Sequence, residues 1–594
     1  MVVVRMVLTV CLAVAAGVVA AEEPPEPAPT PPVRVRLLDE VPDYAKILRN
    51  QWSTTVRPES FESEAGHYGL LTDSVTPRPI TLEECIALAL RNNTGLRVQE
   101  LSPIAATARV RQAYAQFDPA AFGNSGKNRS LSPGTTLTEV SPTPGTSVNL
   151  FTTPDVLGQE IDWNLGVRKE FLTGGRLSLQ WTNARLSSSP SLVNQVVPQY
   201  ATTLGLSLTQ PLLRDFGWRF ALLIVDVAQI NEEQAFYEYK AQVANLIASV
   251  EQAYWVYVLA IENVHVDQRG LDLAKELLRQ NEGRFKVGAL PRTSVLESEA
   301  EVARREANLV RSSALQRIAR DNLRALVNAR DASEDALLMI EPADKPGVAP
   351  AELDLDRSLE VGYKERPELV AARLNVDGRK VERKIAENRL LPRLDFVGGV
   401  GTNGLGGNNA NLPSQSAFPG IAFDPNPTVL GGYNRSLELL TDGRFYQYQF
   451  GAVLEVPFDN AEAKARYAEA KVNSEGARLS LSQLEENVTL EITQSVNNLK
   501  ALLKSIEATR IARELAEENV RNQQARYDVG LATTKDLIDF TDRLTQAERA
   551  EIEALSNYNI EVARLHRADG TLLRDRSVLL ERTGPEPPPW YARF

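Results

Sequence analysis

The sequence predicts a mainly α protein with a smaller β part. Long coiled-coil helices would form a tube, joined to strands of a transmembrane β-barrel, in two internal repeats. Three observations predict this fold. One interrupted-helix motif occurs twice, as RFKVGALPRTSVLE (284–297) and RYDVGLATTKDLID (526–539). A long stretch before each motif repeats apolar residues every three or four positions, and shorter stretches upstream alternate with a period of two.

The first 21 residues have the pattern of an export signal. Arg5 provides a positive start, an apolar run follows, and Ala20 and Ala21 suit signal-peptidase cleavage. The run is shorter than the roughly 20 apolar residues that span a membrane. Cys11 raises a lipoprotein alternative, but LTVC lacks small residues before the cysteine. We therefore expect a signal peptide at 1–21.

Proline-rich segments flank the rest of the chain. Residues 22–79 contain EEPPEPAPTPP and predict an extended periplasmic tether. Residues 581–594 form a similar Pro-rich tail. Between them, we place the first repeat at 80–330, a linker at 331–352 and the second repeat at 353–580.

Composition excludes several classes of function. The net charge of −12 argues against a nucleic-acid binder, whose domains usually carry a basic face. After signal cleavage Cys85 is the one remaining thiol, so no intramolecular disulfide can form, and its apolar neighbours predict a buried helix position. The three histidines, His67, His265 and His566, lack ligand spacing, and GNSGK (123–127) is too short for a phosphate-binding loop. We expect neither an enzyme nor a cofactor.

The two repeats align over their opening segments. ITLEECIALALRNNTGLRV (80–98) matches LDLDRSLEVGYKERPELVA (353–371), and Pro119 matches Pro392 at the same offset. Between this proline and the next, the first repeat carries an insertion, which coincides with an extra hairpin at 161–187. The sequence leaves open whether this hairpin joins the barrel or lies beside it.

Long helices are predicted in each repeat before the motif. Apolar residues recur at steps of three and four at Val243, Leu246, Ile247, Val250, Tyr254, Val258, Ile261 and Val264, and at Leu481, Leu484, Val488, Ile492, Val496, Leu499, Leu503 and Ile506. Such a helix would be a rod of roughly 110 Å at 1.5 Å per residue. A rod of that length indicates a coiled coil or a helical tube.

Strands are predicted at about 119–210 and about 392–456. In FYQYQFGAVLEV (445–456), Tyr446, Tyr448 and Phe450 face one way and the glutamines between them face the other. A soluble sheet packed on a core alternates in the same manner. The length of about ten residues, the aromatic positions and loops such as GTNGLGGNNANLPSQSAFPG (401–420) favour a membrane barrel.

The repeated motifs are predicted to be turns between two helices, at about 286–293 and about 528–535. We expect Val529 to pack the end of the long helix and Gly530 to terminate it in a left-handed conformation. Thr533 or Thr534 can cap the next helix, with Asp536 in its first turn. In the first repeat, Ser294 and Glu297 have capping-box spacing.

The order of these features resembles the TolC-type outer-membrane efflux protein family over about residues 80–580. LEECIALALRNNTGL (82–96) is similar to the first helix of that family, and FKVGALPRTSVLE and YDVGLATTKDLID are similar to its periplasmic tip turns. The resemblance implies a homotrimer whose chains share one barrel in outer-membrane lipid and one hollow α-helical barrel in the periplasm. It also implies a passive conduit that docks to a periplasmic adaptor and an inner-membrane pump. The sequence does not name the cargo.

The resemblance also implies roles for the turn residues. Asp536 and Asp539 match carboxylates that line the tunnel constriction in the family, and Ser294 and Glu297 occupy the matching positions of the first repeat. Threefold symmetry would make each carboxylate a ring that favours cations. The alternative is that both aspartates are helix-start acids on a solvated face. Ala532 stands where some members carry a basic residue, so the sequence gives no support to a salt-bridge latch.

Adaptor contact is the other implied role of the turns. The residues concerned are Val287, Gly288, Leu290, Val529, Gly530, Leu531 and Thr533. Helix termination alone also explains the two glycines. The alternative function for the whole chain is an exported coiled-coil envelope or adhesin protein without a channel, which helix periodicity alone would allow.

Overall fold

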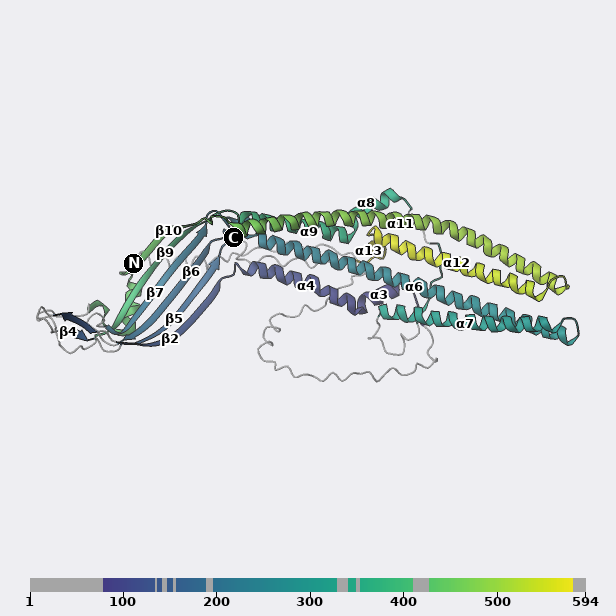
Figure 1. Ribbon diagram of the computed structural model, residues 1–594, viewed down its shortest axis with the longest axis horizontal. Coiled ribbons are helices and arrows are strands. Elements are labelled where there is room, and N and C mark those ends of the chain that lie inside the picture. Colours follow the sequence, from purple (N-terminus) through teal and green to yellow (C-terminus); the bar gives the residue numbers. More distant parts are fainter. Residues whose placement is uncertain are drawn as a thin grey trace, which may run out of the picture.

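The computed structural model describes residues 78–133, 136–140, 147–152, 156–188, 196–327, 340–348, 353–409 and 427–580. The expected signal peptide and tail, nearly all of the tether and most of the linker lie outside these residues. The described part is elongated, with a sheet at one end and long helices running to the other (Figure 1).

The helices form two similar series along the chain. The first series is α3 (Leu82–Asn92), α4 (Thr94–Ala115), α5 (Trp218–Ala221), α6 (Leu223–Lys286) and α7 (Arg292–Val327). The second is α8 (Leu355–Glu365), α9 (Pro367–Asn388), α11 (Ala461–Asp528), α12 (Thr534–Ala568) and α13 (Leu572–Asp575). With 64 and 68 residues, α6 and α11 are each about 100 Å long, which confirms the two long helices.

Local sequence sets the start of the first helices. Thr81 and Glu84 form a capping box at the start of α3. Asn93 ends α3 and caps α4, where its side-chain oxygen accepts a hydrogen bond from the Leu96 N–H at 3.0 Å. In the second series, Asp354 caps α8 and Pro367 opens α9.

The two larger apolar cores of the described residues hold the helices together, and they use the predicted apolar positions. In the first core, Val243, Ile247 and Val250 of α6 pack against α3, α7 and α13. In the second, Val488 and Ile492 of α11 pack against α9 and α12. Trp218–Lys286 is the one helical stretch of the described chain with the length and hydropathy to cross a membrane, and half of its most apolar window is buried.

Cys85 lies in the first core and is fully buried, as predicted. Burial raises the pKa of its thiol to about 12, and the nearby carboxylates of Glu84 and Asp344 act in the same direction. The thiol therefore stays protonated and behaves as a small apolar side chain.

Six strands form one antiparallel sheet in the order β10-β9-β7-β6-β5-β2. The strands are β2 (Ala120–Ser132), β5 (Val156–Glu170), β6 (Arg176–Ser188), β7 (Val196–Pro211), β9 (Arg393–Asn409) and β10 (Tyr446–Glu455). The extra hairpin that the sequence predicted at 161–187 is β5–β6, and it lies inside this sheet between β2 and β7. Two small sheets pair β1 (Arg78–Ile80) with β8 (Ile340–Pro342) and β3 (Thr136–Val140) with β4 (Ser147–Thr152).

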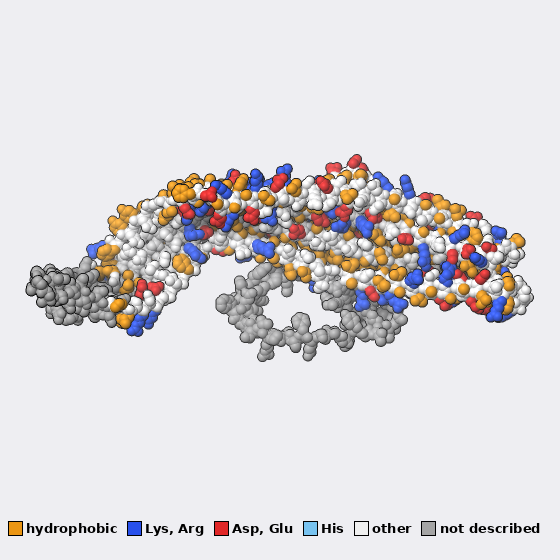
Figure 2. Space-filling view, in the orientation of Figure 1, with side chains coloured by type: hydrophobic (Ala, Val, Ile, Leu, Met, Phe, Trp, Pro, Cys, Tyr) orange, Lys and Arg blue, Asp and Glu red, His pale blue; other side chains and the backbone are white. Residues whose placement is uncertain are grey.

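The two faces of the six-stranded sheet differ in polarity. The register aligns apolar residues on one face, including Leu165, Val167, Leu177, Leu179, Trp181, Leu204, Leu206, Leu208, Val400, Tyr448 and Phe450. The opposite face carries Asn164, Arg168, Ser178, Gln180, Ser207, Thr209, Gln447 and Gln449, with glycines between them. Charged side chains are sparse over the middle of the sheet and dense along the helices (Figure 2).

One predicted loop is partly wrong. Residues 401–409, expected to begin a loop, belong to β9, while 410–426 lie outside the described residues. The helix α10 (Gly432–Asp442) then packs on β9 and β7, with a short 3-10 helix (Pro427–Val429) before it. Gly404 makes this packing possible, because a Cβ there would lie 1.8 Å from the carbonyl oxygen of Ser436. Gly404 is therefore a strand glycine at which the backbone of another element, α10, packs closely.

Candidate functional site

The two helical hairpins end in turns of the same geometry. Hairpin 1 is α6–α7 with the turn 287–291, and hairpin 2 is α11–α12 with the turn 529–533. Gly288 and Gly530 have φ values of 76° and 78°. The Ala289 and Leu531 N–H groups donate to the carbonyls of Arg284 and Arg526, both at 2.8 Å, which is the Schellman pattern. The prediction that both glycines terminate their helices is confirmed.

The turns expose apolar side chains. Val287 is 79% exposed, Val529 71% and Leu531 71%, while Leu290 is half-buried. The expectation that Val529 packs the helix end is therefore wrong. Tyr527 fills that position instead, because it precedes the reversal of the chain and points back onto Leu277 and Leu537.

The start of α12 is held by a capping box. The Thr533 hydroxyl accepts from the Asp536 N–H at 3.2 Å, and the Asp536 carboxylate accepts from the Thr533 N–H at 3.0 Å. The Thr533 hydroxyl also donates to the Asp536 carboxylate, at 2.7 Å, and the two hydrogen bonds that this carboxylate accepts from Thr533 lower the pKa of Asp536. Asp536 is thus a helix-start acid, and it and Asp539 are both exposed, whereas Thr534 and Leu537 of the same helix are buried.

The start of α7 differs from that of α12. The expected capping box at Ser294 and Glu297 does not form. The helix α7 already begins at Arg292, so Ser294 lies inside the helix and not at its N-cap. The Ser294 N–H already donates to the carbonyl of Pro291 at 3.2 Å. Glu297 is exposed and Ser294 half-buried, so neither is drawn into the core.

A polar cluster joins the two hairpins just behind the turns, and we call it the interhairpin cluster. Its first layer surrounds the buried Asn281 of α6. Asn281 donates to the hydroxyls of Ser298 (2.7 Å) and Thr534 (3.3 Å) and accepts from the Tyr527 hydroxyl. Because these partners come from α7, α12 and α11, one side chain ties all four helices together. The Arg284 guanidinium lies 4.7 Å from the Tyr527 ring centre and pairs with Asp528 at 3.1 Å.

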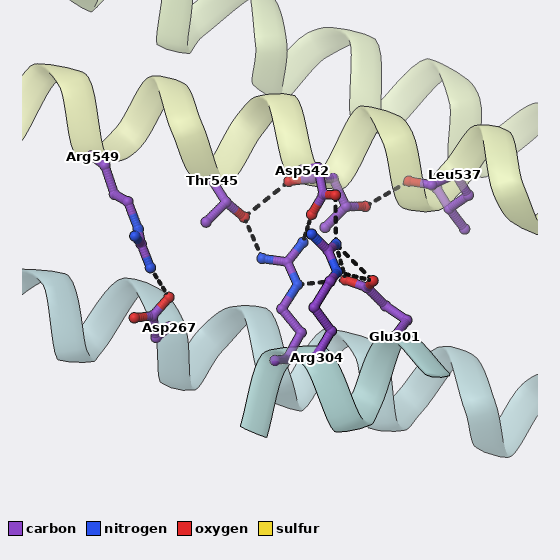
Figure 3. Close-up of polar contacts among 9 residues, drawn as sticks. Asp267, Glu301, Arg304, Leu537, Asp542, Thr545 and Arg549 are labelled. Atoms are coloured by element: carbon purple, nitrogen blue, oxygen red, sulfur yellow. Dashed lines mark hydrogen bonds and ion pairs between the residues drawn. The ribbon is translucent and has the colours of Figure 1, made fainter. Parts of the chain in front are cut away.

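The second layer is a network of ion pairs between α7 and α12 (Figure 3). Arg305 is 3% exposed and pairs with Glu301 of its own helix and with Asp542 of hairpin 2. It also donates to the Thr545 hydroxyl at 3.0 Å. Arg304 pairs with the second oxygen of Asp542 at 2.5 Å. Asp542 of hairpin 2 therefore pairs with two guanidinium groups of hairpin 1.

In the third layer the acid lies on hairpin 1 and the arginine on hairpin 2, the reverse of the second layer. Asp267 of α6 is fully buried and pairs with Arg549 of α12 (Figure 3). One glycine makes room for the network between these layers. A Cβ at Gly270 would lie 3.0 Å from the Arg305 guanidinium, so the buried Gly270 leaves space for that side chain against α6.

This cluster could not be recognised from the amino-acid pattern. Arg305 and Asp542 lie in charged amphipathic stretches, where a buried charge and a solvated one follow the same pattern. The one local signal was Gly270, a helix-weakening residue inside a long helix. In the described residues, no group of three or more His, Cys, Asp or Glu side chains is arranged to hold a metal ion.

Comparison with known proteins identifies the family. The model of the family described as "Outer membrane efflux protein" matches residues 174–329 and 363–571. The outer membrane protein TolC of Escherichia coli (strain K12) is 25% identical over 381 residues, which cover 63% of this chain and 70% of TolC. TolC of Vibrio cholerae is 23% identical, with coverage of 62% and 76%.

Solved structures share the fold at lower identity. The CmeC outer membrane channel of Campylobacter jejuni has a TM-score of 0.57 at 15% identity, covering 83% of this chain and 86% of CmeC. The outer membrane protein VceC of Vibrio cholerae has a TM-score of 0.56 at 19% identity, covering 82% and 96%. Because the family model spans both long helices, both turns and most of the sheet, this chain belongs to the outer membrane efflux protein family.

Proposed function

We propose that this chain is an outer-membrane channel-tunnel that passively exports small molecules or polypeptides as part of a tripartite efflux or type I secretion system. One observation carries the proposal. A single chain joins a sheet with one apolar and one polar face to helices about 100 Å long that end in exposed turns. The sheet suits lipid on one side and water on the other, and the helices suit a periplasmic tunnel.

Closure of the sheet supports a homotrimer. Among the described residues, β2 and β10 are the edge strands of the sheet, and each has one neighbour. An open edge cannot lie in lipid, because its unpaired N–H and C=O groups have no water to bond. Copies of the chain would close the barrel by pairing β10 of one with β2 of the next. The paired lengths of α3 and α8, 11 residues each, and of α4 and α9, 22 residues each, support two internal repeats.

The dimensions support the placement in the envelope. The 10 residues of β10 match the 9–11 or so that a tilted strand needs to cross a bilayer. The helices then carry the turns far into the periplasm. There, Val287, Leu531 and their exposed neighbours offer a small apolar surface to a periplasmic adaptor, which would couple the channel to an inner-membrane pump.

The interhairpin cluster supports a gate at the tunnel tip. Its buried ion pairs hold hairpin 2 against hairpin 1, and an opening motion that separates the hairpins must break them. Asp536 and Asp539, with Ser294 and Glu297 on hairpin 1, would line the constriction as threefold rings. Replacing both aspartates with Asn should then lower the cation selectivity of the open channel, measured as reversal potential in a salt gradient. Unchanged selectivity would leave the two residues as helix-start acids.

Extraction tests the proposed function. We expect the mature chain to fractionate with outer membranes, to require detergent for release and to run as a trimer that dissociates on heating. A mature chain that is soluble and monomeric would contradict the proposal and favour an exported coiled-coil protein without a channel.

A further inference from the structure

We propose that the β5–β6 hairpin widens the shared barrel, so that each trimer has an eighteen-stranded outlet with six strands from each chain. This inference rests on the proposed function, because it needs the trimer and the barrel. It adds a statement about the outer-membrane end of the tunnel: the outlet would be a wide aqueous pore that does not itself hold back bulky solutes.

The hairpin is continuous with the rest of the sheet. β5 pairs with β2 without interruption from Ala120↔Arg168 to Ser132↔Val156. β6 pairs with β7 from Arg176↔Thr209 to Leu186↔Gln199. At about 4.8 Å between neighbouring strands, β2 and β7 are separated by three strand spacings, or roughly 14 Å. The hairpin is therefore part of the wall that connects β2 to β7.

The polarity of the wall continues across the hairpin. Leu165 and Val167 of β5 and Leu179 of β6 lie on the same face as Leu206 of β7. Trp163 and Trp181 pack edge to face on it, with ring centres 4.7 Å apart. The other face of the hairpin carries Asn164, Arg168, Ser178 and Gln180, as a water-filled lumen requires.

The turn of the hairpin is built into the junction with the helices. The Gln210 side-chain amide donates to the carbonyl of Thr173 at 2.9 Å, and the Gly217 N–H donates to the same carbonyl at 3.2 Å. Gly174, with φ of 80°, leaves no room for a side chain, because a Cβ would lie 2.5 Å from the carbonyl oxygen of Asp215. The hairpin thus spans the sheet down to the segment that starts the first long helix.

The strand count sets the width of the outlet. The second repeat supplies two strands of the sheet, β9 and β10, and the first supplies four. Without the hairpin, each repeat would supply two, and three chains would give twelve strands. Barrel diameter grows roughly in proportion to strand number, so eighteen strands at 4.8 Å spacing and about 40° tilt give a backbone diameter of about 36 Å, against about 24 Å for twelve. Barrels of 16–18 strands or so enclose an aqueous channel.

Cryo-electron microscopy of the detergent-extracted full chain measures the width directly. We expect a trimer whose barrel is about 36 Å across at the backbone, with eighteen strands. A trimeric channel with a barrel of about 24 Å would overturn the inference and leave the proposed function intact. A monomer without a closed barrel would overturn both.

Thiol labelling gives a second test that needs no deletion of the hairpin. In a Cys85→Ala background, single cysteines are placed at Leu179 and Gln180 of β6, and a charged maleimide is added to outer-membrane fragments. We expect Gln180→Cys to react and Leu179→Cys to be protected by lipid. The matched pair on β7 is Leu206→Cys and Ser207→Cys.

The β7 pair separates the outcomes. If it alternates while both β6 positions react equally, the hairpin lies outside the barrel and the inference is wrong. If the β7 pair also fails to alternate, the sheet is not a membrane barrel, and the proposed function fails with it.

Discussion

The two hairpins share a turn and differ in the side chains that flank it. Gly288 and Gly530 give the same left-handed Schellman turn, and in both cases a Cβ would meet no neighbouring atom within 4 Å. Next to the turns, hairpin 1 presents Arg284, Arg304 and Arg305, and hairpin 2 presents Asp528 and Asp542. The comparison shows that the backbone conformation is the same in both turns, whereas opposite charges on the two hairpins form the ion pairs between them.

The helices after the turns also differ. α12 begins with a capping box at Thr533 and Asp536, whereas α7 begins at Arg292 after Pro291, without one. In hairpin 2, the acid in the first turn of α12, Asp536, is therefore held by the hydrogen bonds of the capping box. Hairpin 1 has no acid in the first turn of α7.

The largest expected effect comes from breaking the charge complementarity. Asp542→Ala removes the one carboxylate that pairs with Arg304 and the buried Arg305 from hairpin 2, so that Glu301 of α7 and the Thr545 hydroxyl are their remaining named partners. Breaking a buried ion pair costs about 3–5 kcal/mol. Because Asp542 is partly exposed, we expect the lower end of that range. Hydrogen exchange of the tip amides measures it as lost protection, since exchange reports local opening.

The matched control is Glu276→Gln, which removes an exposed ion pair to Arg279 within α6. It should leave tip protection unchanged. Equal protection in Asp542→Ala and the control would show that the interhairpin cluster does not hold the hairpins together.

The next prediction tests whether the two turns have the same backbone geometry. Gly288→Ala and Gly530→Ala force a side chain into a left-handed conformation, at a cost of roughly 1–2 kcal/mol each. The two losses should be equal within error, because φ and the free space around both glycines match. Protection of the turn amides against hydrogen exchange measures them.

Gly283→Ala is the control for these variants. It lies within α6 with open space around it, so alanine should stabilise the helix by up to about 1 kcal/mol. A loss at only one of Gly288 and Gly530 would contradict the common geometry.

A smaller effect tests the difference between the helix starts. Thr533→Ala removes the cap of α12 and should cost about 1 kcal/mol. Ser294→Ala should have little effect, because Ser294 lies inside α7 and caps nothing. Exchange of the first-turn amides of each helix checks both values, and an equal loss in the two variants would mean that α7 also relies on a side-chain cap.

The smallest effect is a pH dependence of the second tip. The pKa of Asp536 is lowered in the folded protein because Thr533 donates hydrogen bonds to its carboxylate. Its contribution to stability is therefore complete above the unfolded pKa of about 3.9 and is lost as pH falls through the lowered value. Exchange protection of the α12 start should drop over that acidic window, and Asp536→Asn should remove the drop. The same drop in the variant would assign it to another group.

Local signals in the sequence predicted the elements and the turns. The glycines at 288 and 530, and the apolar steps around Val250 and Ile492, act within a few residues, so a pattern can identify them. The start of α7 was misplaced because Pro291 and Ser294 both suit a helix start, and only the backbone decides between them.

Contacts between distant segments were not predictable in the same way. The pairing of Arg305 with Asp542 joins residues 237 positions apart, and neither residue's neighbours indicate that it is buried. The helix α10 on β9 was missed for a similar reason, because the glycines that receive it read as a loop. Such features follow from packing and not from local pattern.

Single-channel recording tests the central claim most directly. Purified trimers in a planar bilayer should give discrete ionic currents. Asp542→Ala should increase the current severalfold if the interhairpin cluster holds the tip closed, as proposed. Trimers that insert into the bilayer and pass no discrete current, as wild type or as the variant, would contradict the account of this chain as a gated conduit.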